Sequence, residues 1–180
     1  MAGRQDWRII EGLGNTILAN VEGDLFEIGL GRSTPIFVQF AKKFNRDLYC
    51  FDMVKRKCRW AKERGAKVFK GRSLDFLDQF PDISIAMGLI DGDHRYETVI
   101  QEFNFFLPKL TYGGVIFLHD TYPPEEWVRD DGRFCGEVYK VRQELESRND
   151  IQIFTWPYTA INCGISMVMK KELNRSYCRE

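Results

Sequence analysis

The sequence predicts an α/β fold: a doubly wound, mostly parallel, seven-stranded (Rossmann-like) sheet with helices on both faces. Short apolar runs alternate with longer amphipathic runs along all 180 residues, as expected of strand–helix repeats. The last two apolar runs are separated only by PYTAI, which is too short for a parallel crossover. The last strand is therefore expected to be antiparallel, at an edge of the sheet. Because no Pro/Gly/Ser-rich linker divides the chain, residues 1–180 are expected to form a single domain.

The first half of the chain shows clear helix signals between its short apolar runs. In 5–20 the apolar residues recur at three- and four-residue spacing, which predicts an N-terminal helix. Pro35 suits a first helical turn, Gly65 a helix C-cap and Ser73 a helix N-cap. The predicted helices are 5–20, 34–44, 54–65 and 73–80, and the predicted strands are 24–29, 47–52 and 67–71.

The second half begins with a run, 83–91, that is nearly all apolar and therefore predicts a strand covered on both faces. Asp93 is expected to cap the next helix, and Phe103, Phe105 and Phe106 are expected to face the core. The predicted strands here are 83–91, 113–120, 151–156 and 162–170, and the predicted helices are 95–110 and 134–148.

The composition excludes several classes of protein. Twenty-six basic and 26 acidic residues leave no net charge, so there is no electrostatic reason to expect a nucleic-acid or membrane partner. The five cysteines form no C-x-x-C pair, which argues against a disulfide framework or a structural zinc site. The first residues lack the apolar core of a signal peptide, and no apolar run reaches membrane-spanning length. A reduced, cytoplasmic, soluble protein is expected.

Glycine or polar residues lie at the carboxyl end of every predicted parallel strand. They are Glu27 to Ser33, Asp52, Gly71 to Ser73, Asp91 to His94, and His119 with Asp120. In a doubly wound sheet, ligands bind outside the carboxyl ends of the strands, near the point where the strand order reverses. We therefore expect these residues to surround one ligand cleft.

The first of these strand ends carries a G-x-G sequence. Gly29 and Gly31 would let the backbone turn tightly and approach a ligand, and the next helix offers free N–H groups to an anion. A simple strand-to-helix turn is the alternative. A nicotinamide enzyme would have a third glycine where this chain has Thr34. Asp52, at the spacing of an acid that binds ribose hydroxyls, favours a nucleotide-type ligand.

The chain resembles the class I S-adenosylmethionine-dependent methyltransferases in three stretches: FEIGLGRST, YCFD and LIDGDHRYETVIQEFNFFLPKLTYGGVIFLHDT. It is most similar to the small-molecule O-methyltransferase-like branch, in which IDGDH is followed by GGVI and HDT. The resemblance covers about residues 22–170. It implies S-adenosylmethionine as cofactor and methylation of a hydroxyl group on a small molecule.

The resemblance also assigns cofactor contacts to the ends of the first four strands. The residues are Glu27, Gly29, Gly31 and Ser33 for the methionine part, Asp52 for the ribose hydroxyls, Ser73 and Leu74 for the adenine, and Asp91 for the sulfonium end.

Two kinds of catalysis are open at the fourth and fifth strand ends. In metal-dependent relatives the positions matching Asp91, His119 and Asp120 hold Mg²⁺. Histidine is a poor ligand for Mg²⁺, although Asp91 and Asp120 with waters and two substrate oxygens would suffice. Alternatively, His94 or His119 would act as general base and deprotonate the acceptor hydroxyl.

Two other functions compete with methyl transfer. A catalytically idle relative would bind a nucleotide-like ligand without transferring a methyl group. Little chain precedes the first strand to cover a substrate, so the loop 121–133 is expected to be the lid, helped by a homodimer partner. A non-haem iron site of His94, His119 and one aspartate is disfavoured, because the glycine loop, Asp52 and the strand order fit a nucleotide fold.

Overall fold

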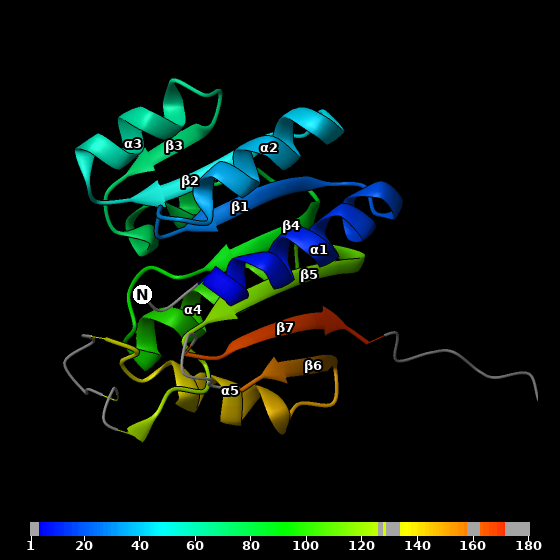
Figure 1. The fold of residues 1–180 in the computed structure, drawn as a ribbon, viewed down its shortest axis with the longest axis vertical. Helices are drawn as coiled ribbons and strands as arrows, with labels where there is room; N and C mark the ends of the chain where they lie inside the picture. The colour runs from blue at the N-terminus through cyan, green and yellow to red at the C-terminus, as the bar shows by residue number, and fades with distance from the viewer. Residues whose placement is uncertain (1–3, 126–127, 129–133, 158–162, 172–180) are drawn as a thin grey trace, which may run out of the picture.

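The computed structural model describes residues 4–125, 128, 134–157 and 163–171, and these residues form the predicted doubly wound α/β fold (Figure 1). One sheet contains seven strands in the order β3-β2-β1-β4-β5-β7-β6. The strands are β1 Asp24–Ile28, β2 Leu48–Asp52, β3 Lys67–Lys70, β4 Ile85–Ile90, β5 Leu110–His119, β6 Ile151–Trp156 and β7 Ile165–Lys170. The strands β1 to β5 pair in parallel.

The last strand is antiparallel, as predicted, but it does not lie at the edge. β7 pairs with β5 on one side and with β6 on the other, so β6 is the edge strand. Val168 of β7 is opposite Ile116 of β5 and Ile153 of β6, and its side chain is fully buried. The chain passes from β5 through α5 (Val138–Glu146) to β6, which lies one strand away from β5. The chain then returns, and β7 occupies the position between them.

Helices cover both faces of the sheet (Figure 1). α1 (Arg4–Asn20), α2 (Thr34–Phe44) and α3 (Lys55–Lys62) lie on one face, where Ile10, Phe37 and Ala61 belong to one buried core. α4 (Tyr96–Phe106), α5 and the short 3₁₀ helix η1 (Ser73–Gln79) lie on the other face with a second core. Among the described residues, no helix is both long enough and apolar enough to span a membrane.

The predicted aromatic core is confirmed. Phe103 and Phe106 of α4 are fully buried, and Phe105 is partly buried against the same core. The ring of Phe106 stacks on Phe26 of β1, with the ring centroids 3.8 Å apart. This contact fixes α4 over β1 and β4, next to the strand ends that surround the site.

Three predicted caps are wrong in detail. The segment after β3 is a 3₁₀ helix, and the hydroxyl of Ser73 is donated to Glu102 instead of capping it. α3 ends at Lys62, and Gly65, with φ +95°, lies beyond its C-cap. Asp93 does not cap α4, because the N-cap position of that helix is Arg95. Asp93 Oδ1 instead accepts a hydrogen bond from the Arg95 N–H at 3.0 Å in an Asx turn.

Candidate active site

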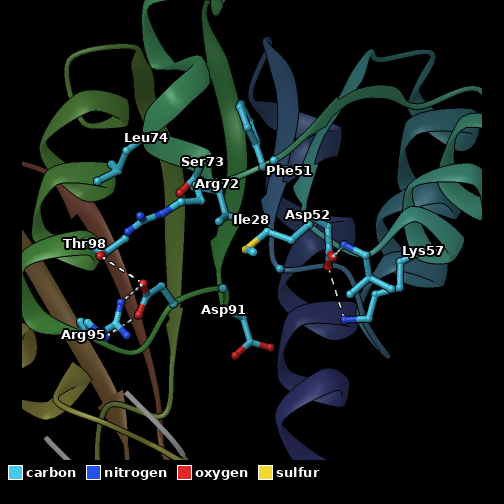
Figure 2. Close-up of a pocket in the computed structure, with 16 residues that line it drawn as sticks. Ile28, Phe51, Asp52, Lys57, Arg72, Ser73, Leu74, Asp91, Arg95 and Thr98 are labelled. Carbon is cyan, nitrogen blue, oxygen red and sulfur yellow. Dashed lines mark hydrogen bonds and ion pairs between the residues drawn. The ribbon is translucent and has the colours of Figure 1, made fainter. Parts of the chain in front are cut away.

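The carboxyl ends of β1 to β4 enclose a cavity of about 580 Å³ (Figure 2). β1 and β4 are neighbours at the centre of the sheet, where the strand order reverses, so this is the position at which such folds bind ligands. Its size suits a small-molecule ligand. Five of the predicted site residues line it: Gly29, Asp52, Ser73, Leu74 and Asp91. The predicted cleft is therefore present at the ends of the first four strands, but His94, His119 and Asp120 do not line it.

The loop after β1 is held against the loop after β4 at Gly29. Its φ is +84°, and a Cβ atom there would overlap the carbonyl of Asp91. The Asp91 N–H donates to the carbonyl of Ile28 at 2.9 Å, so the two strand ends are also hydrogen-bonded. Only glycine combines this conformation with this approach, and the contact sets the position of Asp91 at the cavity wall.

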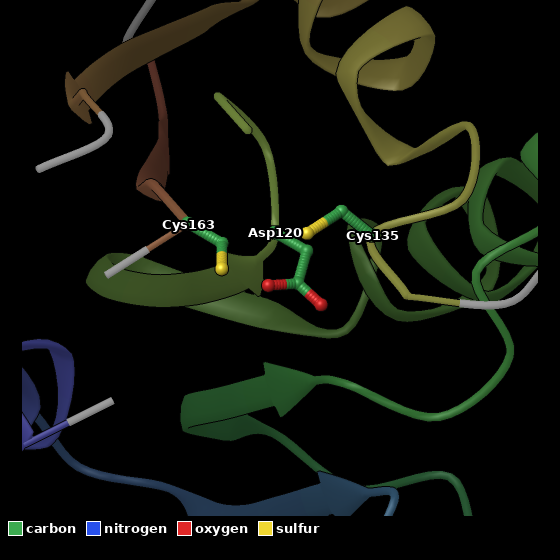
Figure 3. Close-up of side chains that lie close together, drawn as sticks. All are labelled: Asp120, Cys135 and Cys163. Atoms are coloured by element: carbon green, nitrogen blue, oxygen red, sulfur yellow. The ribbon is translucent and has the colours of Figure 1, made fainter. Parts of the chain in front are cut away.

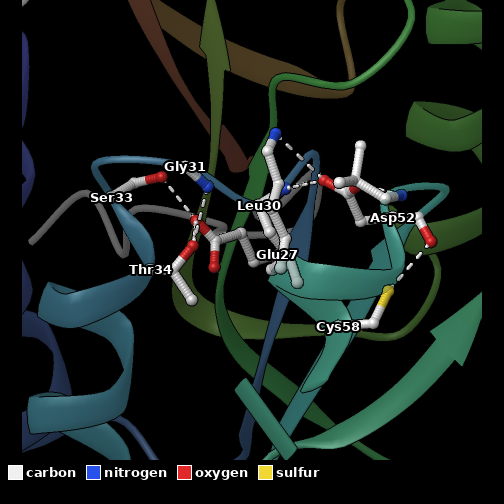
Figure 4. Close-up of polar contacts among 9 residues, drawn as sticks. Glu27, Leu30, Gly31, Ser33, Thr34, Asp52 and Cys58 are labelled. Atoms are coloured by element: carbon white, nitrogen blue, oxygen red, sulfur yellow. Dashed lines mark hydrogen bonds and ion pairs between the residues drawn. The ribbon is translucent and has the colours of Figure 1, made fainter. Parts of the chain in front are cut away.

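Glu27 and Ser33 support the loop after β1 and do not line the cavity (Figure 4). Both are fully buried, and Glu27 Oε1 accepts hydrogen bonds from the hydroxyls of Ser33 and Thr34, the latter at 3.2 Å. The Thr34 hydroxyl in turn accepts the Gly31 N–H at 2.8 Å. The shaping role predicted for Glu27 fits this arrangement. The contact predicted between Ser33 and the cofactor stays a prediction, because its hydroxyl is donated to Glu27.

Gly31 lies over a smaller neighbouring cavity of about 270 Å³. A Cβ atom at Gly31 would meet no other atom within 4 Å. Its contact with the cofactor therefore stays a prediction as well.

Asp52 joins the loops after β1 and β2 (Figure 4). Its Oδ2 accepts the Leu30 N–H at 2.8 Å and lies 3.3 Å from the Lys57 ammonium, and its Oδ1 accepts the Val54 N–H at 2.6 Å. A carboxylate has about four acceptor positions, so Asp52 can still accept a hydrogen bond from a ligand hydroxyl in the cavity. Hydrogen bonds from the backbone thus fix the orientation of the Asp52 side chain, which would in turn orient such a ligand.

A buried carboxyl group behind the cavity was not predicted from the sequence. Glu102 of α4 is fully buried, and its Oε1 accepts the Ser73 hydroxyl. Burial raises the pKa of Glu102 to about 8 against the opposing effect of that hydrogen bond. The partner of Ser73 is 29 residues away along the chain, and no local pattern in the sequence indicates the pair.

Replacing Glu102 by glutamine is expected to flatten the pH dependence of unfolding. The pKa of Glu102 is higher in the folded protein than its ordinary value of 4.5, so its protonation stabilises the fold at low pH. That stability is lost as the pH rises from about 5 towards 8, by about 1.4 kcal/mol per pH unit for one proton. Urea unfolding at several pH values would measure the slope. Glu97→Gln, an exposed change on the same helix, should leave the slope unchanged, and an unchanged slope in Glu102→Gln would contradict the assignment.

Two acids and two histidines form a cluster next to the cavity. His119 Nδ1 lies 3.1 Å from an oxygen of Asp91 and 3.1 Å from an oxygen of Asp120. His94 Nε2 lies 3.5 Å from Asp91 Oδ1 and 3.6 Å from Asp120 Oδ2. The ring of Trp7 in α1 stacks on His119 with the centroids 4.8 Å apart. The candidate catalytic residues at the ends of β4 and β5 therefore lie in one cluster.

The protonation of this cluster follows from its geometry. Burial lowers the pKa of His94, but the hydrogen bond to Asp91, the charges of Asp120 and Asp91 and the carbonyl of Phe134 outweigh it and raise the pKa to about 9. Burial raises the pKa of Asp91, and the two histidines outweigh it and hold that pKa well below its ordinary value. At neutral pH, His94 is therefore an imidazolium ion beside ionised Asp91, which suits a fixed cation better than a base.

These residues are a poor match for Mg²⁺. Ligand atoms of Asp91, His94 and Asp120 do lie within 4.8 Å of one another. Mg²⁺ requires near-octahedral oxygen coordination, however, and imidazole nitrogens of His94 and His119 face the carboxylate oxygens that it would need. Magnesium binding by Asp91 and Asp120 stays a prediction.

The predicted lid, 121–133, lies largely outside the described residues. Its described part begins beside the cluster, where Thr121 is fully buried and accepts the Ser166 hydroxyl at 2.8 Å. Tyr122, the next residue, is 46% exposed, so the chain turns outward at this point.

The fold and the cavity define the class of the protein: a doubly wound α/β protein with a cavity at the switch point of its sheet. Residues 26–121, or 96 of the 180 residues, match the family model of a methyltransferase domain. The chain belongs to this methyltransferase family. No curated protein matches the sequence. Family membership also weighs against the non-haem iron alternative.

Solved structures share the fold at low sequence identity. Rv0187 from MTB, solved with its cofactor bound, has a TM-score of 0.75 and 15% identity over 94% of this chain and 81% of its own. A Staphylococcus aureus protein proposed to be a caffeoyl-CoA O-methyltransferase has a TM-score of 0.72 and 15% identity over 95% and 85%. The Podospora anserina methyltransferase PaMTH1, bound to S-adenosylhomocysteine, has a TM-score of 0.68 and 14% identity over 96% and 80%.

Proposed function

We propose that the protein is an S-adenosylmethionine-dependent methyltransferase that methylates a hydroxyl group of a small molecule. The observation that carries the proposal is the cavity at the switch point, with Asp52 and Asp91 on neighbouring loops of its wall. A family that transfers methyl groups needs a donor site of this size at this place. Two similar folds, Rv0187 and PaMTH1, were solved with a cofactor and with S-adenosylhomocysteine respectively.

The walls of the cavity match the parts of the proposed cofactor. Phe51, Ser73 and Leu74 form a partly apolar wall suited to adenine, and Asp52 faces the place where the ribose would lie. Gly29 keeps the loop after β1 free of a Cβ atom where the methionine part would pass. Bound there, S-adenosylmethionine would supply the methyl group on its sulfonium, near Asp91.

We assign the general base to His119 and a positioning role to His94. Methyl transfer to a hydroxyl requires a nucleophile in line with the methyl group, removal of its proton and exclusion of water. His119 is oriented by Asp91 and Asp120, which would also stabilise the imidazolium formed when it takes the proton. His94 would stay charged, hold the two carboxylates in place and offset part of their charge, and His119 would act as the base in its neutral form. The balanced net charge supports a small molecule as acceptor in place of a nucleic acid.

Isothermal titration calorimetry with S-adenosylhomocysteine tests the cofactor, and a panel of phenolic and aliphatic alcohols with S-adenosylmethionine tests the reaction. We expect micromolar or tighter binding, and formation of S-adenosylhomocysteine with at least one alcohol. No binding at millimolar ligand would overturn the proposal. Binding without transfer to any acceptor would favour the idle relative, which binds a nucleotide-like ligand only.

Replacing Asp52 by asparagine is expected to weaken S-adenosylhomocysteine binding by about tenfold or more, because a charge-assisted hydrogen bond contributes roughly 1.5–3 kcal/mol. The change also disturbs the hydrogen bonds that Asp52 accepts from Leu30 and Val54. A comparison of S-adenosylhomocysteine with an analogue that lacks the ribose hydroxyls separates the two effects. Removing the ribose hydroxyls from the ligand should reduce its affinity for the wild type but hardly for Asp52→Asn. Equal losses in both proteins would show that Asp52 does not bind the ribose.

A further inference from the structure

Three buried side chains with metal-binding groups converge beside the cluster of acids and histidines (Figure 3). They are Asp120, Cys135 and Cys163, which are 7%, 2% and 6% exposed. One ligand atom from each lies within 4.8 Å of the other two. The proposed methyl transfer uses neither cysteine, so their position next to Asp120 requires another explanation.

The sheet holds Cys163 against Asp120. Asp120 directly follows β5, Cys163 shortly precedes β7, and these strands are antiparallel neighbours. Beyond the strand ends the Tyr122 N–H donates to the Cys163 carbonyl at 3.1 Å. Gly164 has φ +84°, and a Cβ atom there would overlap Tyr122. The turn that carries Cys163 therefore requires glycine at the next position.

A second Cys-Gly pair holds the other thiol. Gly136 follows Cys135, has φ +51°, and a Cβ atom there would overlap the His94 carbonyl. The same carbonyl accepts the Glu137 N–H at 2.7 Å. The third member, Asp120, itself has φ +60°, a conformation that non-glycine residues rarely adopt. The left-handed backbone at or next to all three residues brings their side chains together, and such conformations collect at functional sites.

We propose that Asp120, Cys135 and Cys163 bind a Zn²⁺ ion. Two thiolates and a carboxylate are a soft, charged ligand set that favours Zn²⁺ over Mg²⁺, Ca²⁺ and Mn²⁺. Tetrahedral zinc with bonds of about 2–2.3 Å needs ligand atoms roughly 3.3–3.8 Å apart, which the 4.8 Å limit on their separations allows. Three protein ligands leave the fourth position to water. The set of Asp91, His94 and Asp120 shares Asp120 with this one but contains no sulfur.

The ion would connect three segments of the chain: the end of β5, the turn before α5 and the turn before β7. It would hold the Asp120 carboxylate, one of the two that orient His119. Because the folded protein would bind zinc and the unfolded protein would bind it only weakly, zinc is expected to raise the melting temperature.

Metal titration tests this proposal without any knowledge of the methyl acceptor. The reduced full-length protein is treated with a chelator, dialysed, and titrated with Zn²⁺ against a chromogenic chelator, and separately with Co²⁺. We expect one Zn²⁺ per chain and a near-ultraviolet thiolate-to-cobalt charge-transfer band. At a urea concentration that exposes both thiols in the zinc-free wild type, zinc should also protect Cys135 and Cys163 from alkylation, as read by mass spectrometry. Unprotected thiols or the absence of the cobalt band would overturn the proposal.

Substitutions locate the ion. Cys135→Ser with Cys163→Ser should weaken Zn²⁺ binding by more than about 100-fold, because loss of even an outer-shell partner costs roughly 10–100-fold. Cys58→Ser, which changes a buried thiol outside the group, should leave the affinity and the cobalt band unchanged. Asp91→Asn should also leave the band unchanged. Equal zinc affinity in the wild type and the double variant would show that the ion binds elsewhere. Circular dichroism would show whether each variant folds. If a variant does not fold, the alkylation of the wild type still tests the proposal.

Discussion

Replacing Gly29 by alanine is expected to destabilise the protein by about 2–5 kcal/mol. A left-handed conformation costs an alanine roughly 1–2 kcal/mol, and forcing a methyl group against packed atoms typically costs a further 1–3 kcal/mol. Here the packed atom is the Asp91 carbonyl oxygen, which belongs to the backbone and cannot rotate away. Urea unfolding monitored by circular dichroism would measure the change. A loss below about 0.5 kcal/mol would contradict the close approach of the two loops.

Gly31→Ala is the matched control in the same loop. Its Cβ atom would meet no neighbour within 4 Å, so the stability should change by no more than about 0.5 kcal/mol. If the methionine part of the cofactor passes over this residue, the added methyl group should still weaken S-adenosylhomocysteine binding by about tenfold, because the ligand would have to shift. The pair therefore separates a glycine required by the fold from one required by the ligand.

The fold was predictable because its signals are local and repeated. Apolar runs such as 85–90 give the strands, and the polar residues that follow them give the ligand side of the sheet without knowledge of which strands are neighbours. The place of β7 was not predictable in this way. The short connection determines that β6 and β7 are antiparallel, but only the tertiary structure determines that β7 enters between β5 and β6.

The site residues also differ in whether a local signal in the sequence indicates them. Gly29, Asp52 and Asp91 were identified because each ends or directly follows a strand, and all three line the cavity. The partners of buried groups were missed because they are distant along the chain. Glu102 behind Ser73 is one case. The cysteines are another: the absence of a C-x-x-C pair argued against zinc, yet positions 135 and 163, which are 28 residues apart, meet at the end of β5.

His119→Asn is expected to reduce kcat by about 10²–10⁴-fold, the usual contribution of a general base. The asparagine amide can replace the Nδ1–H that His119 directs toward Asp91 and Asp120, but it cannot accept the proton of the acceptor hydroxyl. Affinity for S-adenosylhomocysteine should therefore stay within about threefold, well under 1.4 kcal/mol. Initial rates of S-adenosylhomocysteine formation with an alcohol found in the panel, and calorimetry, would measure the two quantities.

His94→Gln is the comparison that distinguishes the base from the positioning residue. The glutamine amide keeps a donor near Asp91 and Asp120, where His94 Nε2 lies. It removes the positive charge and the hydrogen bond between Nδ1 and the Phe134 carbonyl. Because that charge holds two neighbouring carboxylates together, its loss should cost about tenfold in kcat, roughly 1.4 kcal/mol, and less than the loss of a base. A larger loss in His94→Gln than in His119→Asn would exchange the two roles. Equal small losses in both would show that neither histidine is the general base.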